Sequence, residues 1–199
     1  MEPYVITISR QFASMGRSIA KELANELGIA FYDRDIVEET AKRMGLPVSL
    51  VSDTEENSGS IYFKRQYPLG MGISSLKDEI FMVQKNIIRD LVDQGSCIIV
   101  GRCGDSILAD KKRRLNVYIY APAHERFKNC IEKLGMDEDT AKRMMREVDR
   151  SRAIYRKRYC PEVKDEFTNR DLMIDSSRFG IDGTAKMLAR LTRTLFYDE

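Results

Sequence analysis

The chain has 199 residues, of which 43% are hydrophobic and 32% charged, and its formal net charge is +2. This length suits one domain with a substantial core, and the small net charge gives no global electrostatic argument for a nucleic-acid binder. No apolar run approaches the ~20 residues that span a bilayer, and four cysteines without a C-x-x-C pair, beside one histidine, indicate reduced thiols in the cytoplasm and no structural zinc.

Apolar runs and helical periodicity alternate along the chain. Short apolar segments predict five strands: 5–8, 29–32, 97–100, 116–120 and 172–175. Apolar residues at helical spacing predict six helices: 18–27, 33–44, 76–93, about 123–134, 137–158 and 182–195. The stretch 45–75 carries several glycines and many serines and is expected to be a long loop, either a functional flap or a disordered segment. Strands that each lead into helix predict an α/β fold of three layers in a single domain, residues 1–199, with a five-stranded parallel sheet and helices on both faces.

The first strand runs through a loop of small residues into a helix. This order suits a polyphosphate, because backbone N–H groups and the positive end of the helix dipole converge on the anion. The motif G-x-x-x-x-G-K-[ST] is met only in part: Gly16 and Ser18 fit, while Gln11 stands in place of the first glycine and Arg17 in place of the lysine. These residues alone leave an ordinary strand-to-helix turn as the alternative.

Polar residues also follow the later strands, at the sheet edge where ligands of such folds bind. Asp33 follows the second strand and suits either a helix N-cap or a ligand contact. Arg102 follows the third strand after Gly101 and suits either a solvated strand end or bidentate binding of a phosphate, of which we favour the second.

The predicted helix 137–158 is dense in charge. Arg143, Arg146 and Arg150 follow helical steps, so one side carries three guanidinium groups, and Arg152 and Arg156 form a second pair four residues apart. A solvated surface explains such a run. The alternative is a mobile lid over residues 137–160, whose arginines neutralise a transferred phosphoryl group and exclude water.

These pieces together resemble the cytidylate kinase-like proteins, a branch of the P-loop nucleoside monophosphate kinases. The resemblance covers nearly the whole chain and rests on ITISRQFASMGRSIAKELANELGIAFYDRDIV, IIVGRCGDSIL, REVDRSRAIY and LMIDSSRFGIDG. It implies a P-loop kinase fold with an acceptor-binding insert over 46–75 and a helical lid, ATP and Mg²⁺ as cofactors, and transfer of the γ-phosphate to a nucleoside monophosphate or a similar small phosphorylated acceptor. The implied partners are small-molecule nucleotides, with no nucleic acid and no membrane; the acceptor's identity and the oligomeric state stay open.

The resemblance also implies individual roles. The donor phosphates would lie on the loop, with the Ser18 hydroxyl as the Mg²⁺ ligand, on Ser14, Met15, Gly16, Arg17 and Ser18. Asp33 and Arg102 would contact the acceptor. The residues implied in catalysis are Arg17, Arg102, Asp149, Arg152 and, as a helper, Arg146.

The chain departs from the family pattern at four positions. Ala13 and Met15 replace two loop glycines, and Val100 and Cys103 replace the two aspartates of the D-G-R-D stretch. A non-catalytic nucleotide-binding protein that kept the fold is therefore the alternative function. A nucleic-acid-binding regulator using the basic residues 111–114 is a third, weaker reading, since such a cluster also suits a solvated turn before a strand.

Overall fold

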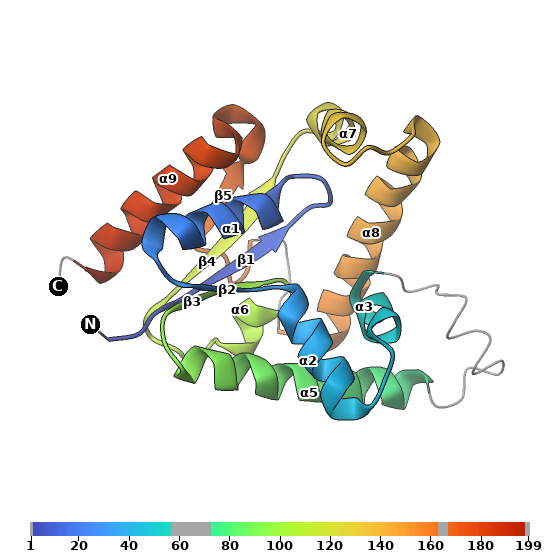
Figure 1. Ribbon diagram of the computed structural model, residues 1–199, viewed down its shortest axis with the longest axis vertical. Helices are drawn as coiled ribbons and strands as arrows, with labels where there is room; N and C mark the ends of the chain where they lie inside the picture. Colours follow the sequence, from blue (N-terminus) through green and yellow to red (C-terminus); the bar gives the residue numbers. More distant parts are fainter. Residues whose placement is uncertain (1, 57–72, 163–166, 198–199) are drawn as a thin grey trace.

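The computed structural model describes residues 2–56, 73–162 and 167–197. Five parallel strands form one sheet in the order β2-β3-β1-β4-β5 (Figure 1). Their bounds are Val5–Arg10 for β1, Ala30–Tyr32 for β2, Cys97–Val100 for β3, Arg114–Tyr120 for β4 and Leu172–Asp175 for β5. The predicted five-stranded parallel sheet is confirmed.

β1 lies at the centre of the sheet, paired with β3 on one side and with β4 on the other. Its side chains alternate between two cores, as the period of two in a strand requires. Ile6 and Ile8 belong to the core on one face, whereas Val5 belongs to the core on the opposite face. Because β1 is buried on both faces, the loop that follows it starts from a rigid point.

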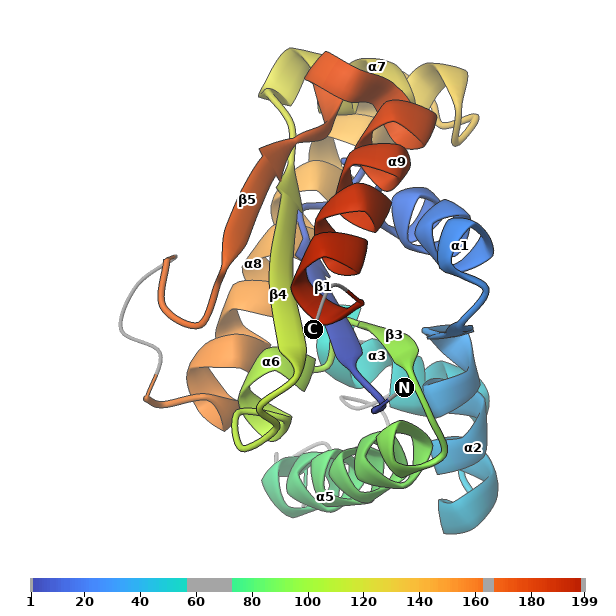
Figure 2. The ribbon, with the colours of Figure 1, turned by 90° about the vertical axis from the view of Figure 1, so that its left-hand side faces the viewer.

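Two helical layers cover the sheet. On one face α1 (Gly16–Leu27) and α9 (Ser176–Phe196) lie side by side (Figures 1 and 2). On the other face lie α2 (Arg34–Met44), α5 (Ile73–Asp93) and the short α6 (Gly104–Ile107). The predicted three-layer α/β architecture is thus confirmed. None of the helices in the described part of the chain is both long and apolar enough to cross a membrane.

Three helices surround one end of the sheet: α3 (Val48–Glu56), α7 (Ala123–Glu132) and α8 (Glu138–Tyr159). α3 occupies part of the stretch that was expected to be a loop, and it packs because Leu50 and Val51 are buried. The remainder of the expected insert, residues 57–72, lies outside the described residues. α9 begins directly after β5, six residues earlier than predicted, where the Asp175 side chain accepts a hydrogen bond from Ser177 N, and Gly180 kinks it.

Candidate active site

A cavity of about 430 Å³ opens beyond the carboxyl ends of β1, β2 and β3. Its lining is strongly cationic: among the described residues five arginines and one carboxylate border it, a formal charge of +4, from Arg10, Arg17, Arg34, Arg102, Arg152 and Asp33. The cavity is the expected place for a ligand in a parallel α/β sheet. Its charge selects for anions.

Hydrogen bonds hold the loop between β1 and α1 in place. The buried Ser14 hydroxyl lies 2.9 Å from the Gln11 carbonyl oxygen and 3.1 Å from that of Ile119 in β4. Ser176 Oγ donates to the Ser14 carbonyl at 2.8 Å, and the Gln11 side chain accepts from Ala121 N at 3.2 Å. These contacts hold residues 11–14 of the loop to the ends of β4 and β5. Ser14 therefore supports the loop and does not line the cavity.

The part of the loop from Met15 onward leaves backbone N–H groups available as donors at the start of α1. The first hydrogen bond that closes onto this helix runs from Ile19 N to the Met15 carbonyl at 2.9 Å, so the N–H groups of Gly16, Arg17 and Ser18 precede it. The Met15 side chain at the N-cap makes no capping hydrogen bond. N–H groups left this way at a helix N-terminus bind anions. Met15, Gly16, Arg17 and Ser18 all line the cavity, as the loop prediction required.

The backbone of the phosphate loop is strained at the two positions that lost glycine, and it leaves no room for a side chain at Gly16. Ala13 and Met15 have φ of 57° and 62°, so both positions that lost glycine keep a left-handed backbone. A non-glycine residue in this region is strained by about 1 kcal/mol or more. Gly16 is required for another reason: a Cβ there would lie 2.7 Å from Arg10 Cβ.

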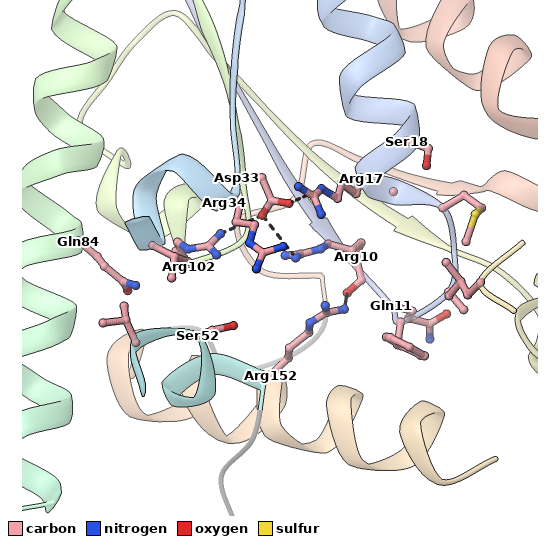
Figure 3. A pocket seen from close by; sticks show the side chains of 17 residues that line it. Arg10, Gln11, Arg17, Ser18, Asp33, Arg34, Ser52, Gln84, Arg102 and Arg152 are labelled. Carbon is pink, nitrogen blue, oxygen red and sulfur yellow. Dashed lines mark hydrogen bonds and ion pairs between the residues drawn. The ribbon is translucent and has the colours of Figure 1, made fainter. Parts of the chain in front are cut away.

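Asp33 lies at the centre of the cationic cluster (Figure 3). Its Oδ2 contacts Arg17 Nε at 2.8 Å, while its Oδ1 contacts Arg102 Nη1 at 3.1 Å and Arg10 Nη2 at 3.9 Å. The Asp33 side chain is only 7% exposed. Asp33 occupies the N-cap position of α2, as the first of its two interpretations expected, but its side chain makes no capping hydrogen bond and contacts the arginines instead.

Arg102 follows β3 on a left-handed backbone, with φ of 52° after Gly101 at 76°. Its Nη1 also donates to the Val100 carbonyl at 2.9 Å, and the residue is buried. The solvated alternative for Arg102 is therefore wrong. Gly16, Asp33 and Arg102 line one cavity, as their positions after neighbouring strands predicted.

The α8 residues divide between the cavity and the scaffold. Arg152 lines the cavity, and its Nη1 lies 3.4 Å from the Arg10 carbonyl oxygen. Asp149 instead holds the loop from outside, because its carboxylate accepts from Phe12 N at 2.7 Å and from Arg126 Nη1 at 2.5 Å. Arg146 is exposed and does not border the cavity. The structure thus places one of these three predicted residues in the cavity lining.

The C-terminal half of α8 is anchored to the body of the protein. Arg156 makes two hydrogen bonds, of 3.0 and 2.6 Å, to the buried Asp105 carboxylate. Burial lowers the pKa of Arg156, but the pairing with Asp105 outweighs it and raises the pKa. Arg158 similarly pairs with Asp78 at 2.8 Å. Arg156 is thus held in a buried ion pair, whereas the lid interpretation expects the arginines of this segment to reach a transferred phosphoryl group.

The basic cluster 111–114 is engaged within the molecule. Lys111 Nζ contacts Asp93 at 2.7 Å, Arg113 Nη2 donates to the Phe196 carbonyl at 2.6 Å, and Arg114 Nη1 donates to the Lys111 carbonyl at 2.6 Å. Arg114 is the first residue of β4. These contacts favour the structural interpretation of the cluster.

The cavity also contains residues that the sequence interpretation missed, among them Arg10, Ser52 and Gln84. One of them carried a usable signal in the sequence. Arg10 is the last residue of β1, where a charged side chain reaches the ligand edge of the sheet. Gln84 lies within the buried stripe of α5, where a polar side chain needs a partner, but this can be recognised only once the rotation of the helix is known.

Comparison with known proteins places this site in a family. The model of the cytidylate kinase-like family matches residues 5–178. A search of curated proteins found no match in sequence. Among solved structures, an uncharacterized protein from Eubacterium ventriosum is 25% identical, with a TM-score of 0.72 over 96% of this chain and 99% of that one.

More distant structures share the fold. Shikimate kinase from Acinetobacter baumannii, in complex with shikimate, is 13% identical with a TM-score of 0.56 over 98% of this chain and 94% of that one. A gluconokinase from Sinorhizobium meliloti is 12% identical with a TM-score of 0.53 over 99% of this chain and 98% of that one. At these identities the likeness establishes the P-loop kinase fold, and the match over residues 5–178 establishes more: the chain belongs to the cytidylate kinase-like family.

Proposed function

We propose that this protein is an ATP- and Mg²⁺-dependent phosphotransferase that moves the γ-phosphate of ATP to a nucleoside monophosphate or a similar small phosphorylated acceptor. The observation that carries the proposal is the row of arginines between the phosphate loop and the far end of the cavity. Family membership supports phosphotransfer in general, and the cavity supports a phosphorylated acceptor.

The donor end fits a nucleoside triphosphate. Backbone N–H groups of Gly16, Arg17 and Ser18 at the N-terminus of α1 would face the donor phosphates, and the exposed Arg17 side chain lies beside them. The Ser18 hydroxyl would be the protein ligand of Mg²⁺. Among the described residues no cluster of three carboxylate, thiol or imidazole groups is available for a metal. This donor set fits Mg²⁺, which keeps several waters and binds largely through substrate phosphates.

The charge of the cavity fits two phosphorylated substrates. ATP with Mg²⁺ and a nucleoside monophosphate each carry about −2 near neutral pH. Their sum matches the formal charge of +4 on the described residues of the lining. An acceptor without a phosphate would leave an excess of guanidinium charge in the cavity. We therefore favour a phosphorylated acceptor over the polyol or carboxylate acceptors that the names of the distant neighbours indicate for those proteins.

The chemistry requires positioning and charge neutralisation. An acceptor phosphate oxygen is already nucleophilic, so in-line transfer needs no dedicated base and no covalent enzyme intermediate. Mg²⁺ would supply charge neutralisation between the donor phosphates. Arg102 and Arg10 would orient the acceptor phosphate, and Arg152 would stabilise the charge on the transferred group. Arg17 would move from Asp33 to the donor phosphates. Residues 137–160 stay a proposed lid, in which the anchored C-terminal half of α8 would serve as the fixed base.

A non-catalytic nucleotide-binding protein is the second candidate, and one observation favours it: Ala13 and Met15 strain the loop at both left-handed positions. The two candidates differ in turnover. With purified protein, ATP and Mg²⁺, we expect ADP to form when a nucleoside monophosphate is supplied, and not with shikimate or gluconate. ATP binding without ADP formation for any acceptor in the panel would favour the non-catalytic protein. The proposed location, the cytoplasm, is consistent with four buried cysteines that are not joined in disulfides, Cys97, Cys103, Cys130 and Cys160.

A further inference from the structure

A buried glutamine lies at the end of the cavity that is distant from the phosphate loop. Gln84 is 1% exposed and shares the inner stripe of α5 with Ile80, Ile87 and Ile88, yet its side chain borders the cavity. A primary amide in such a stripe costs free energy unless it is hydrogen-bonded. Its presence therefore calls for a partner on each side of the amide.

α8 supplies the partner for the oxygen of the Gln84 amide. The Tyr155 hydroxyl donates to Gln84 Oε1 at 3.0 Å in a buried hydrogen bond. Tyr155 is itself wedged between aromatic rings, with centroids 6.2 Å from Phe81 and 4.7 Å from Tyr159. Because Oε1 is turned toward Tyr155, the Nε2 protons are presented to the cavity. Among the residues that the structure describes, none accepts a hydrogen bond from Gln84 Nε2.

The surroundings of Gln84 differ from the rest of the cavity. Figure 3 shows Gln84 at one end and Ser18 and Gln11 at the other, with the arginines between them. Val37 of α2 and Val51 of α3 add apolar wall, and both are buried. One end thus suits the donor phosphates, the middle suits the phosphates that react, and the Gln84 end is left for the remainder of the acceptor.

This end fits a planar ring better than a polyol. Apolar walls with a few placed polar groups are typical of sites for flat heterocycles, whereas each buried hydroxyl of a sugar needs a partner of its own. A fixed N–H donor selects a ligand atom that accepts: a carbonyl oxygen or a ring nitrogen. Nucleobases present such atoms at their edges.

We propose that Gln84 determines acceptor specificity, donating from Nε2 to a carbonyl oxygen or ring nitrogen of a nucleobase that lies against Val37 and Val51. Tyr155 is the positioning residue that fixes the amide. This inference rests on the proposed function, whose acceptor phosphate lies at the arginines. It adds the recognition of the base, which no other residue of the cavity was assigned.

Equilibrium binding tests the inference without turnover. Titration calorimetry would measure CMP, UMP, AMP, GMP and, as a ligand without a base, ribose 5-phosphate. Wild-type protein should bind at least one monophosphate more tightly than ribose 5-phosphate. Gln84→Met, which is neutral and of similar size, should weaken that monophosphate by about 10- to 100-fold and leave ribose 5-phosphate unchanged. Gln94→Met is the matched control, because Gln94 is exposed just after the end of α5.

A second variant keeps the test open if Gln84→Met does not fold. Tyr155→Phe frees the amide to rotate, so the differences in affinity among the four monophosphates should narrow while ribose 5-phosphate binds as before. The inference is overturned if no monophosphate binds more tightly than ribose 5-phosphate, or if the Gln84 variant weakens both ligands equally. Failure of the proposed function is a separate result: a monophosphate binds, yet no ADP forms from ATP.

Discussion

Replacing Asp33 by asparagine should destabilise the protein without ligand and make its stability depend on anions. The Asp33 carboxylate contacts Arg17, Arg102 and Arg10, and the Arg102 and Arg10 side chains are only 7% and 9% exposed. Replacing the carboxylate by a neutral amide removes a negative charge that both buried guanidinium groups contact. Breaking a buried ion pair from one side costs about 3–5 kcal/mol. For a chain of this size that lowers Tm by roughly 6–20 °C.

An anion in the cavity should reverse most of this loss. Inorganic phosphate or ATP supplies the negative charge that asparagine lacks, so added phosphate should raise the Tm of Asp33→Asn more than it raises that of the wild type. Differential scanning calorimetry with and without phosphate measures both effects. The control is Asp35→Asn, which removes the same charge from an exposed position in the first turn of the same helix. Its effect should stay below about 1 kcal/mol.

Two results would refute this reasoning. If Asp33→Asn and Asp35→Asn have the same Tm, Asp33 does not balance the charge of the arginine cluster. If phosphate raises the Tm of the wild type and of Asp33→Asn equally, the ligand anion does not take the place of the carboxylate.

Further substitutions separate the donor site, the transferred phosphate and the scaffold. Arg17→Ala should weaken ATP binding about tenfold or more by calorimetry, whereas Lys21→Ala, one turn beyond the loop, should not; equal losses would count against the loop. Arg152→Ala should lower the rate of ADP formation about 10²- to 10³-fold with Tm unchanged, because it supplies charge to the transition state, and Arg190→Ala on the exposed side of α9 is its control. A drop in Tm with an unchanged rate would make Arg152 structural. Asp137→Ala should destabilise α8 at pH 7, because its carboxylate caps that helix and the hydrogen bond from a backbone N–H lowers its pKa. That contribution is present above the ordinary pKa of 3.8 and is lost as pH falls through the lowered pKa. The denaturation curves of the wild type and of Asp137→Ala should therefore converge in acid. A constant difference in stability between the two proteins down to strong acid would exclude the capping role.

The sequence predicted the central architecture because parallel α/β folds follow strict rules. Polar residues directly after buried strands must meet at one sheet edge, and Gly16, Asp33 and Arg102 do meet there. The pattern of apolar runs was enough to identify each strand. Strand ends were less well predicted: β1 extends to Arg10 and β4 starts at Arg114, because neighbouring strands continue the hydrogen-bond ladder into polar residues.

Contacts between residues far apart in the chain could not be predicted. The anchoring of α8 depends on Asp105 and Asp78, which lie 51 and 80 residues from their arginine partners. No local pattern distinguishes such an arginine from one on a solvated face. α3 was missed because its apolar residues form only a weak stripe along one side of the helix, and because its packing depends on buried partners in α2 and α5.

Gln84 was missed for a related reason. The apolar residues whose helical spacing predicts the helix 76–93 include Val83, which is only partly buried in α5, whereas the neighbouring Gln84 faces the interior. A helix rotation of one residue moves the inner stripe by about 100°. The position of an isolated polar residue within a buried stripe is therefore a useful signal only when the rotation of the helix is known.

The central claim is that this cavity transfers phosphate between two phosphorylated substrates, and ³¹P NMR of the product tests it most directly. Protein incubated with ATP, Mg²⁺ and a panel of nucleoside monophosphates should give the resonances of a nucleoside diphosphate from the acceptor together with ADP. Both signals should disappear when Mg²⁺ is omitted, and they should fall sharply for Arg152→Ala. Slow ATP hydrolysis to ADP and inorganic phosphate, with every acceptor returned unchanged, would contradict the claim.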